Sequence, residues 1–194
     1  GGDDTNTTAA DLAAYLHEDD YELNRFFATT EIDTVIDRVE STYTTFAHGD
    51  TSDQSLRDSR THRAFGGFSM GATTTWDVFS MRPQYFYGYM PMAGESWIGR
   101  ATDADLDQIA QLLTAGSERA DYGAGDFRIL ASVGSDDPAL GDMSPQLDEL
   151  RLDYPELMTP DSLQLWVDEG ETHSMESVQN QVAHSLPLLL PPAQ

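Results

Sequence analysis

The chain of 194 residues contains no cysteine and no lysine. Without cysteine it can form neither a disulfide bridge nor a cysteine-ligated metal site. Its 10 basic residues are all arginines, and 34 acidic residues stand against them, which gives a formal net charge of −24. Because so acidic a surface repels phosphate groups and anionic lipids, we expect neither nucleic acids nor membrane surfaces as partners.

Long hydrophobic runs are also absent. The longest apolar stretch, SLPLLLPP near the C-terminus, is far shorter than the roughly 20 residues that a membrane-spanning helix needs. No segment has the pattern of a secretory signal peptide, and the start GGDDTNTT indicates a processed or trimmed chain. The length suits one domain with a sizeable core.

The first sixty residues are polar and mostly helical in pattern. Two helices are expected, in residues 8–20 and 29–43, the second with a capping signal at Thr30. The segment 48–60 predicts a solvated loop, and no strand is expected before Arg63. The apolar residues of the second helix form one face: Ile32, Val35, Ile36, Val39 and Tyr43.

From residue 63 onward, strand and helix patterns alternate. Short apolar runs predict strands, and each is followed by a segment with helical spacing. The aromatic cluster YFYGY is assigned to strand core. This alternation predicts an α/β fold with a largely parallel sheet. The predicted strands are 63–68, 85–94, 126–134 and 162–170, and the predicted helices are 70–81, 102–116, 144–154 and 174–189.

A short glycine-rich motif lies at the first strand-to-helix boundary. Gly67-Phe68-Ser69-Met70-Gly71 matches G-x-S-x-G in the strand–turn–helix context that this motif needs. A nucleophile on so sharp a turn has a strained backbone, and glycines two residues away on either side remove collisions. The helix start directs its N-terminal dipole at the serine, and the Met70 N–H can donate to an oxyanion. The motif therefore indicates Ser69 as a nucleophile.

A nucleophilic serine needs a base and an orienting acid. In α/β-hydrolases the order is serine, acid, histidine, and His173 and His184 follow the serine. His173 comes directly after a predicted strand, where catalytic residues of open α/β sheets lie, whereas His184 falls within the last helix. The acid is expected after the strand 126–134, where Asp136, Asp137 and Asp142 are candidates.

Four segments together carry a family resemblance: HRAFGGFSMGATTTW, YMPMAGESW, GSDDPALGDMSPQLDEL and GETHSM. In order and spacing they resemble the feruloyl esterases of carbohydrate esterase family 1, esterase D-like α/β-hydrolases, and especially the bacterial modules attached to xylanases. The likeness runs from about residue 30 to residue 190. It implies Ser69 as nucleophile, His173 as base and Asp137, the fourth residue of a Gly-Ser-x-Asp motif, as acid. It also implies that Trp97 lines the substrate pocket.

The chain departs from the family pattern at two places. The family tends to have an aromatic residue directly after the catalytic histidine, whereas this chain has Ser174 and Met175. An aromatic wall for a ferulate ring is therefore weakened or replaced, and ester hydrolysis is better supported than ferulate specificity. The family also commonly has a second glycine after the motif, where Ala72 stands here.

Part of the α/β-hydrolase fold has no counterpart in the sequence. The nucleophile strand of this fold lies in the middle of its sheet, but predicted strands occur only after it. The segment that supplies the other strands also carries the loop that completes the oxyanion hole, and residues 1–62 contain no such loop. We therefore expect residues 1–194 to be the C-terminal two-thirds of one esterase domain, with an N-terminal segment of the same domain as partner.

The leading interpretation is a serine esterase that releases hydroxycinnamoyl groups such as ferulate from plant cell-wall polysaccharide. It acts through an acyl-enzyme and requires no metal and no organic cofactor. A feruloylated polysaccharide or oligosaccharide as substrate implies an extracellular or cell-surface location. Two alternatives stay open: an esterase for another acyl group, such as an acetyl, lipid or siderophore ester, and a catalytically silent carbohydrate-binding module.

Overall fold

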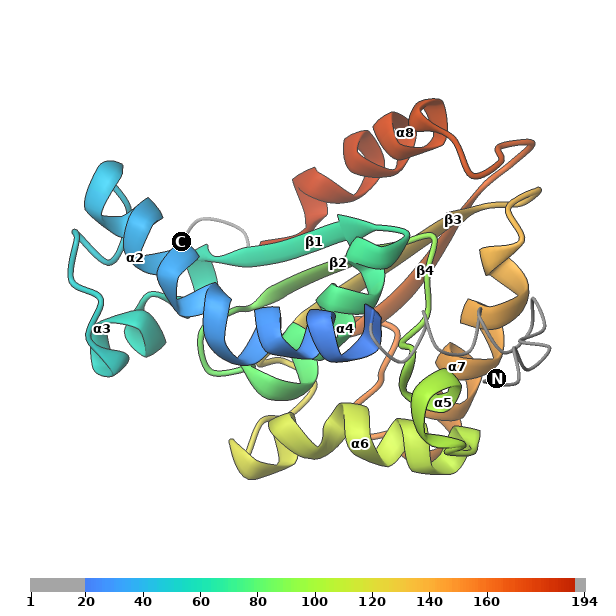
Figure 1. The fold of residues 1–194 in the computed structure, drawn as a ribbon, viewed down its shortest axis with the longest axis horizontal. Helices are drawn as coiled ribbons and strands as arrows, with labels where there is room; N and C mark the ends of the chain where they lie inside the picture. The colour runs from blue at the N-terminus through green and yellow to red at the C-terminus, as the bar shows by residue number, and fades with distance from the viewer. Residues whose placement is uncertain (1–19, 191–194) are drawn as a thin grey trace, which may run out of the picture.

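Four parallel strands form the sheet of this protein (Figure 1). The computed structural model describes residues 20–190. The strands lie in the order β1-β2-β3-β4, and Ser132 of β3 is in register with Met92 of β2 and Trp166 of β4. All four predicted strands are thereby confirmed. Their bounds are β1 Ala64–Phe68, β2 Gly88–Met92, β3 Arg128–Gly134 and β4 Leu163–Asp168.

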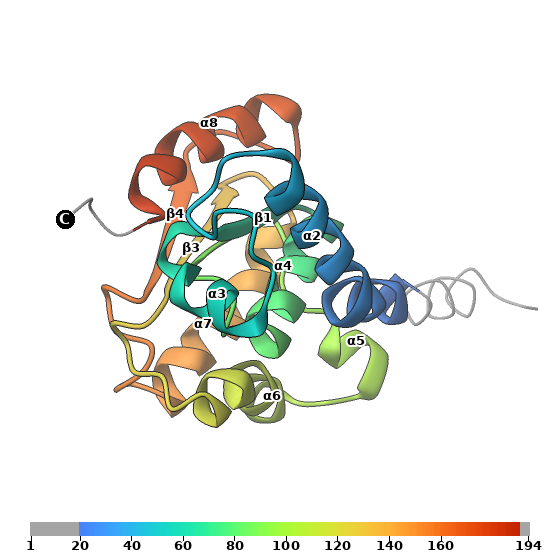
Figure 2. The same ribbon diagram turned by 90° about the vertical axis from the view of Figure 1, so that its left-hand side faces the viewer.

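Helices cover both faces of the sheet (Figure 1, Figure 2). The helices that connect successive strands, α4, α6 and α7, pack on one face, as parallel crossovers of one hand require. Helix α8 packs on the other face, against β2, β3 and β4. The helices of this part are α4 Met70–Met81, α5 Ile98–Thr102, α6 Leu106–Arg119, α7 Ala139–Asp153, α8 Met175–Ser185 and the 3-10 turn η3 Leu186–Leu188.

Side chains of the two central strands alternate between two apolar layers, as the pleat of a strand dictates. Tyr89 and Ile129 face the main core, which they share with α4, α6 and α7. Met90 and Leu130 face the smaller layer under α8. The predicted assignment of the aromatic cluster to strand core is confirmed for Tyr89 of β2, whereas Phe86 is buried in the segment before that strand.

The bounds of two helices differ from the sequence expectation. Helix α6 continues past Gly116 to Arg119, and its start is fixed by a capping box of Asp105 and Gln108. Helix α7 begins at Ala139, five residues before the predicted start at 144. The fully buried residues of α8 are polar, namely Ser177, Gln181 and Ser185, while Val182 packs on the smaller apolar layer. Gln181 accepts a hydrogen bond from Ser132 at 2.8 Å and so satisfies a buried hydroxyl of the sheet.

The region before β1 is one bent helix followed by two short ones. Residues 20–26 are helical and continue without a break through η1, Phe27–Glu31, into α2, Ile32–Thr42. The helix 29–43 is confirmed, but the capping signal at Thr30 is wrong because this residue lies inside the π-helical turn. The predicted loop 48–60 contains α3, Asp53–Asp58, and runs into η2, Arg60–His62. The predicted helix 8–20 lies almost wholly outside the described residues.

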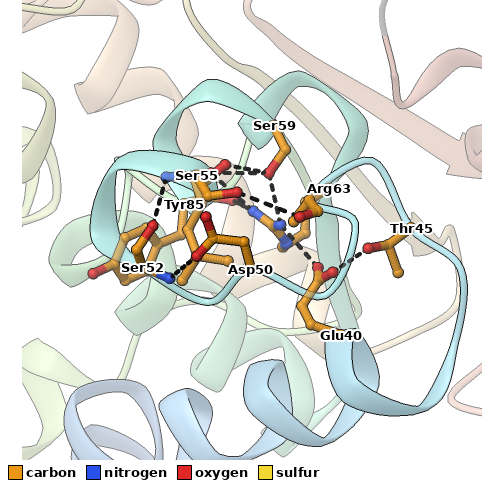
Figure 3. A network of polar contacts seen from close by, with 10 residues as sticks. Glu40, Thr45, Asp50, Ser52, Ser55, Ser59, Arg63 and Tyr85 are labelled. Atoms are coloured by element: carbon orange, nitrogen blue, oxygen red, sulfur yellow. Dashed lines mark hydrogen bonds and ion pairs between the residues drawn. The ribbon is translucent and has the colours of Figure 1, made fainter.

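A buried polar network ties α2 and α3 to the start of β1 (Figure 3). The Arg63 guanidinium donates to Glu40 at 3.0 Å, to the Ser59 hydroxyl at 3.0 Å and to the Tyr85 carbonyl at 2.8 Å. Thr45 donates a further hydrogen bond to Glu40. Because both charged groups are largely buried, this pair fixes α2 against the sheet.

Strand β1 pairs on one side only within residues 20–190, and its residues are only half buried. A mostly apolar cavity of about 360 Å³ lies between α2 and the start of β1, lined by Phe65 among others. A second cavity, of about 370 Å³, is lined in part by the glycines of β1, Gly66 and Gly67. On the expected apolar face of α2, Val35 and Val39 remain exposed. In the described part of the chain, no helix is long and apolar enough to cross a membrane.

Candidate active site

Ser69 lies on the sharp turn between β1 and α4. Its backbone has φ 58° and ψ −118°, a strained combination for a residue with a side chain. The Ser69 N–H donates to the Met92 carbonyl at 2.8 Å, which holds the turn against the end of β2. The structure thus places the predicted nucleophile where strain and a fixed backbone present its hydroxyl at the end of the sheet.

The glycines around this turn have unequal roles. A Cβ at position 67 would lie 2.5 Å from the Gly71 carbonyl oxygen, whereas a Cβ at position 71 would meet nothing within 4 Å. The expected collision therefore exists at Gly67 only. Gly94, in the segment after β2, also has to lack a side chain, because a Cβ there would lie 2.7 Å from the Ser69 carbonyl oxygen.

Met70 is the first residue of α4, directly after the serine. Backbone N–H groups at the first turn of a helix have no acceptor within the helix, and the helix dipole places partial positive charge there. The Met70 N–H therefore lies at a position from which a backbone donor can stabilise negative charge beside Ser69.

The structure brings Asp137 and His173 together. The His173 Nδ1 and Asp137 Oδ2 atoms lie 2.8 Å apart, and the other carboxylate oxygen accepts from the Ala139 N–H at 2.9 Å. Asp137 is 4% exposed, so the histidine finds a carboxylate that is held in place and shielded from water. The other two candidate acids are exposed, and Asp142 pairs with Arg100 instead.

A close approach of two loops makes this pairing geometry possible. The loop after β4 passes so near to Gly134 that a Cβ there would lie 2.1 Å from the Glu171 carbonyl oxygen. That carbonyl accepts from the Asp136 N–H at 2.9 Å, and the Gly170 N–H donates to the Ser135 hydroxyl at 2.8 Å. The glycine thus allows the His173 loop to lie beside the Asp137 loop. In the sequence, Gly134 is simply the last residue of a predicted strand, and nothing there indicates the close approach of the later loop.

An aromatic ring contacts the histidine from an unexpected position. Phe68, inside the G-x-S-x-G motif, packs on the His173 imidazole with ring centroids 4.4 Å apart. The two residues after the histidine form no aromatic wall: Ser174 caps α8 by accepting from Ser177 N–H, and Met175 is 69% exposed. Phe68 thus restricts the imidazole from the nucleophile's own strand.

One cavity of about 350 Å³ contains the predicted residues Ser69, Trp97, Asp137 and His173 in its lining. The segment after β2 and helix α7 contribute an ion-pair cluster to this lining. Arg100 pairs there with Glu95 at 2.6 Å and with Asp142 at 2.9 Å, and burial raises the pKa of Glu95. His184, the other histidine that follows the serine, lies elsewhere, with its ring stacked on Trp166.

Comparison with known proteins points to one family. The chain is 32% identical over 157 residues, 79% of its length, to endo-1,4-beta-xylanase Y of Acetivibrio thermocellus. A mutant of the feruloyl esterase module from Clostridium thermocellum, complexed with sinapinate, matches with a TM-score of 0.74 at 27% identity over 88% of this chain. A structure of FAE matches the same share at 28% identity and a TM-score of 0.73. No family model matches.

The chain resembles a xylanase-attached feruloyl esterase module. The family resemblance and the α/β-hydrolase fold predicted from the sequence are thereby confirmed. The chain spans 58% of each solved chain and 14% of the xylanase that it matches. The sheet described here accordingly represents part of what those longer chains contain.

Proposed function

We propose that this chain is the catalytic part of a serine esterase that releases ferulate or a related hydroxycinnamate from plant cell-wall polysaccharide. One observation carries the proposal: Ser69, on a strained turn at a helix N-terminus, lines one cavity with a His173 that is hydrogen-bonded to a buried Asp137. Nucleophile, base and orienting acid in this arrangement are what acyl transfer through a serine requires.

In the first half of the reaction the Ser69 hydroxyl attacks the ester carbonyl carbon. His173 takes the hydroxyl proton on Nε2, because its Nδ1 is engaged with Asp137. Asp137 holds the ring orientation and stabilises the imidazolium that forms. The proton then passes to the sugar oxygen as the C–O bond breaks, which releases the carbohydrate alcohol and leaves the acyl group on Ser69.

The negative oxygen of the tetrahedral intermediate needs donors that are already in place. The Met70 N–H at the start of α4 supplies one. In the second half of the reaction His173 activates a water molecule, which attacks the acyl-enzyme and frees the carboxylic acid. No step in this sequence uses a metal ion or an organic cofactor.

The acyl group proposed here is aromatic because Trp97 offers a flat apolar surface in the same cavity. The relatives support this choice, since one of them is a feruloyl esterase module complexed with sinapinate and another is a xylanase. Insoluble plant polysaccharide as substrate would place the enzyme outside the cell or on its surface.

We further propose that strands of the same domain, N-terminal to this chain, complete the sheet along β1. Three observations support this partner: the unpaired edge of β1 within residues 20–190, the apolar cavities beside it, and the greater length of the solved relatives. A paired β1 would bury the exposed Val35 and Val39 and would allow a second oxyanion donor, whose loss lowers the rate by about 10²–10³.

Labelling with a fluorophosphonate probe, followed by intact and peptide mass spectrometry, tests the nucleophile. We expect one adduct on Ser69 and none in Ser69→Ala. Initial rates on methyl ferulate and on a short acyl ester then test the acyl group, with methyl ferulate as the better substrate. Preference for the short ester would favour an esterase for another acyl group. If the probe labels Ser69 neither in this chain nor in a longer chain that includes the proposed N-terminal strands, a catalytically silent module would be favoured.

A further inference from the structure

Arg100 is a charged residue in the lining of the cavity that contains Ser69. It lies on the short helix α5 and lines the cavity together with Ser69 and Trp97, and 38% of its side chain is exposed. The reaction steps described above do not use it. Its position in the lining of this cavity suggests a contact with the ligand.

The guanidinium of Arg100 is anchored through one nitrogen only. Its Nη2 atom lies 2.6 Å from Glu95 Oε1 and 2.9 Å from Asp142 Oδ2. Within residues 20–190, the N–H groups of Nε and Nη1 have no protein acceptor. The side chain is thus held in place by carboxylates from two different elements, and further donors are left for a ligand. Such a fixed fork loses little entropy when it donates.

The charges around Arg100 indicate which ligand groups it can bind. Glu95 and Asp142 together outweigh its single positive charge, and Asp137 is a further carboxylate in the lining of the same cavity. A ligand carboxylate or phosphate would therefore meet net repulsion at this wall. Neutral oxygen acceptors are repelled far less and still accept strong hydrogen bonds from a charged donor.

Trp97 lies beside this donor, since the guanidinium carbon of Arg100 is 5.9 Å from the centre of the Trp97 ring. A hydroxycinnamoyl ring that stacked on Trp97 would therefore lie beside this guanidinium. We propose that Arg100 is a specificity-determining residue that donates hydrogen bonds to the hydroxyl and methoxyl oxygens of the hydroxycinnamoyl ring. This inference rests on the proposed function and names the part of the substrate that the wall recognises.

Binding to the inactive Ser69→Ala chain tests this role without the need for turnover. The ligands are methyl ferulate, which carries both ring oxygens, and methyl cinnamate, which carries none, and isothermal titration calorimetry gives each Kd. With Arg100 present we expect methyl ferulate to bind about tenfold more tightly, as suits a hydrogen bond to a charged group. In Ser69→Ala/Arg100→Met the two esters should bind equally, because only methyl ferulate loses affinity.

Arg151→Met in the same background is the matched control. Arg151 is similarly exposed and pairs with Asp148 at 3.3 Å, but it does not line the cavity. It should leave both affinities unchanged. With the serine restored, Arg100→Met should raise KM for methyl ferulate and leave kcat nearly unchanged, since a ring contact far from the carbonyl acts equally on ground and transition states.

The alternative results separate this inference from the function on which it rests. An equal loss of affinity for both esters in Arg100→Met would mean that Arg100 only braces the wall, and a retained preference would mean that it does not contact the ring. Either result overturns the inference and leaves the esterase proposal standing. Binding of neither ester by Ser69→Ala overturns the inference, and turnover of methyl ferulate by the Ser69 chain then decides the esterase proposal separately.

Discussion

Asp77 should make the stability of this protein fall as the pH rises toward neutrality. The carboxyl group lies on the inner face of α4, 1% exposed, and its Oδ2 atom has no hydrogen-bond partner in the described part of the chain. Loss of solvation raises its pKa from 3.8 to about 7, with nearby Arg25 opposing the rise and Glu22 adding to it. Folding therefore favours the protonated acid.

The sign and size of the effect follow from proton linkage. Between pH 4 and pH 7 the unfolded chain carries an ionised Asp77 while the folded chain keeps it protonated. The folded state then binds more protons, so the free energy of unfolding decreases as pH rises through this window. A rise in pKa of about three units corresponds to a loss of roughly 4 kcal/mol at pH 8.

Urea denaturation of Asp77→Asn and the parent chain at pH 4, 5.5 and 8 measures this effect. Asparagine is neutral at every pH, so the two chains should have similar stability at pH 4, and the variant should be the more stable at pH 8 by up to about 4 kcal/mol. Asp161→Asn removes one exposed carboxylate and controls for the high net charge. A stability difference between Asp77→Asn and the parent that does not change with pH would refute the reasoning.

Three further substitutions test the site and its support. Asp137→Asn should lower kcat on methyl ferulate by about 10⁴ in steady-state assays and leave the melting temperature nearly unchanged, because the wrong imidazole tautomer is favoured; a loss below tenfold would contradict its role. Gly134→Ala should destabilise the chain by about 3 kcal/mol in urea titrations, because the added Cβ would overlap the Glu171 carbonyl. Gly141→Ala is the control and should leave the stability nearly unchanged, because a Cβ there would meet nothing within 4 Å. Arg63→Met should cost about 3 kcal/mol by leaving a buried carboxylate unpaired, and an unchanged urea midpoint would show that this pair does not hold α2.

Local sequence pattern was sufficient for the elements that form the sheet. Helix α4 begins at Met70 and ends at Met81, as its spacing predicts, because a strained turn precedes it and Pro83 follows it. The strands were recognisable because parallel strands covered on both faces are short and continuously apolar. The predicted start of α6, at residue 102, is four residues too early, because the capping box at Asp105 sets the start at Leu106.

The parts that the sequence did not predict depend on contacts between distant residues. Nothing near Gly134 shows that a loop 37 positions later, at Glu171, will pass against it. The stacking of Phe68 on His173 and the anchoring of Arg100 by carboxylates of two elements likewise exist only in the folded chain. Three aspartates follow the strand that carries the acid, and only the family resemblance selects Asp137 among them. The burial of Asp137 that distinguishes it exists only in the folded chain.

The exposed apolar face of α2 has a physical explanation in the same terms. Its spacing predicts one buried face, yet Ile32 and Ile36 are buried while Val35 and Val39 remain exposed beside the open edge of β1. A helical face of this width has to pack against something for its burial to stabilise the fold. The buried half packs on this chain, and the exposed half borders the apolar cavity at the start of β1. The pattern of α2 is therefore consistent with a core that continues across β1, and the strands proposed to pair there would explain why these valines are apolar.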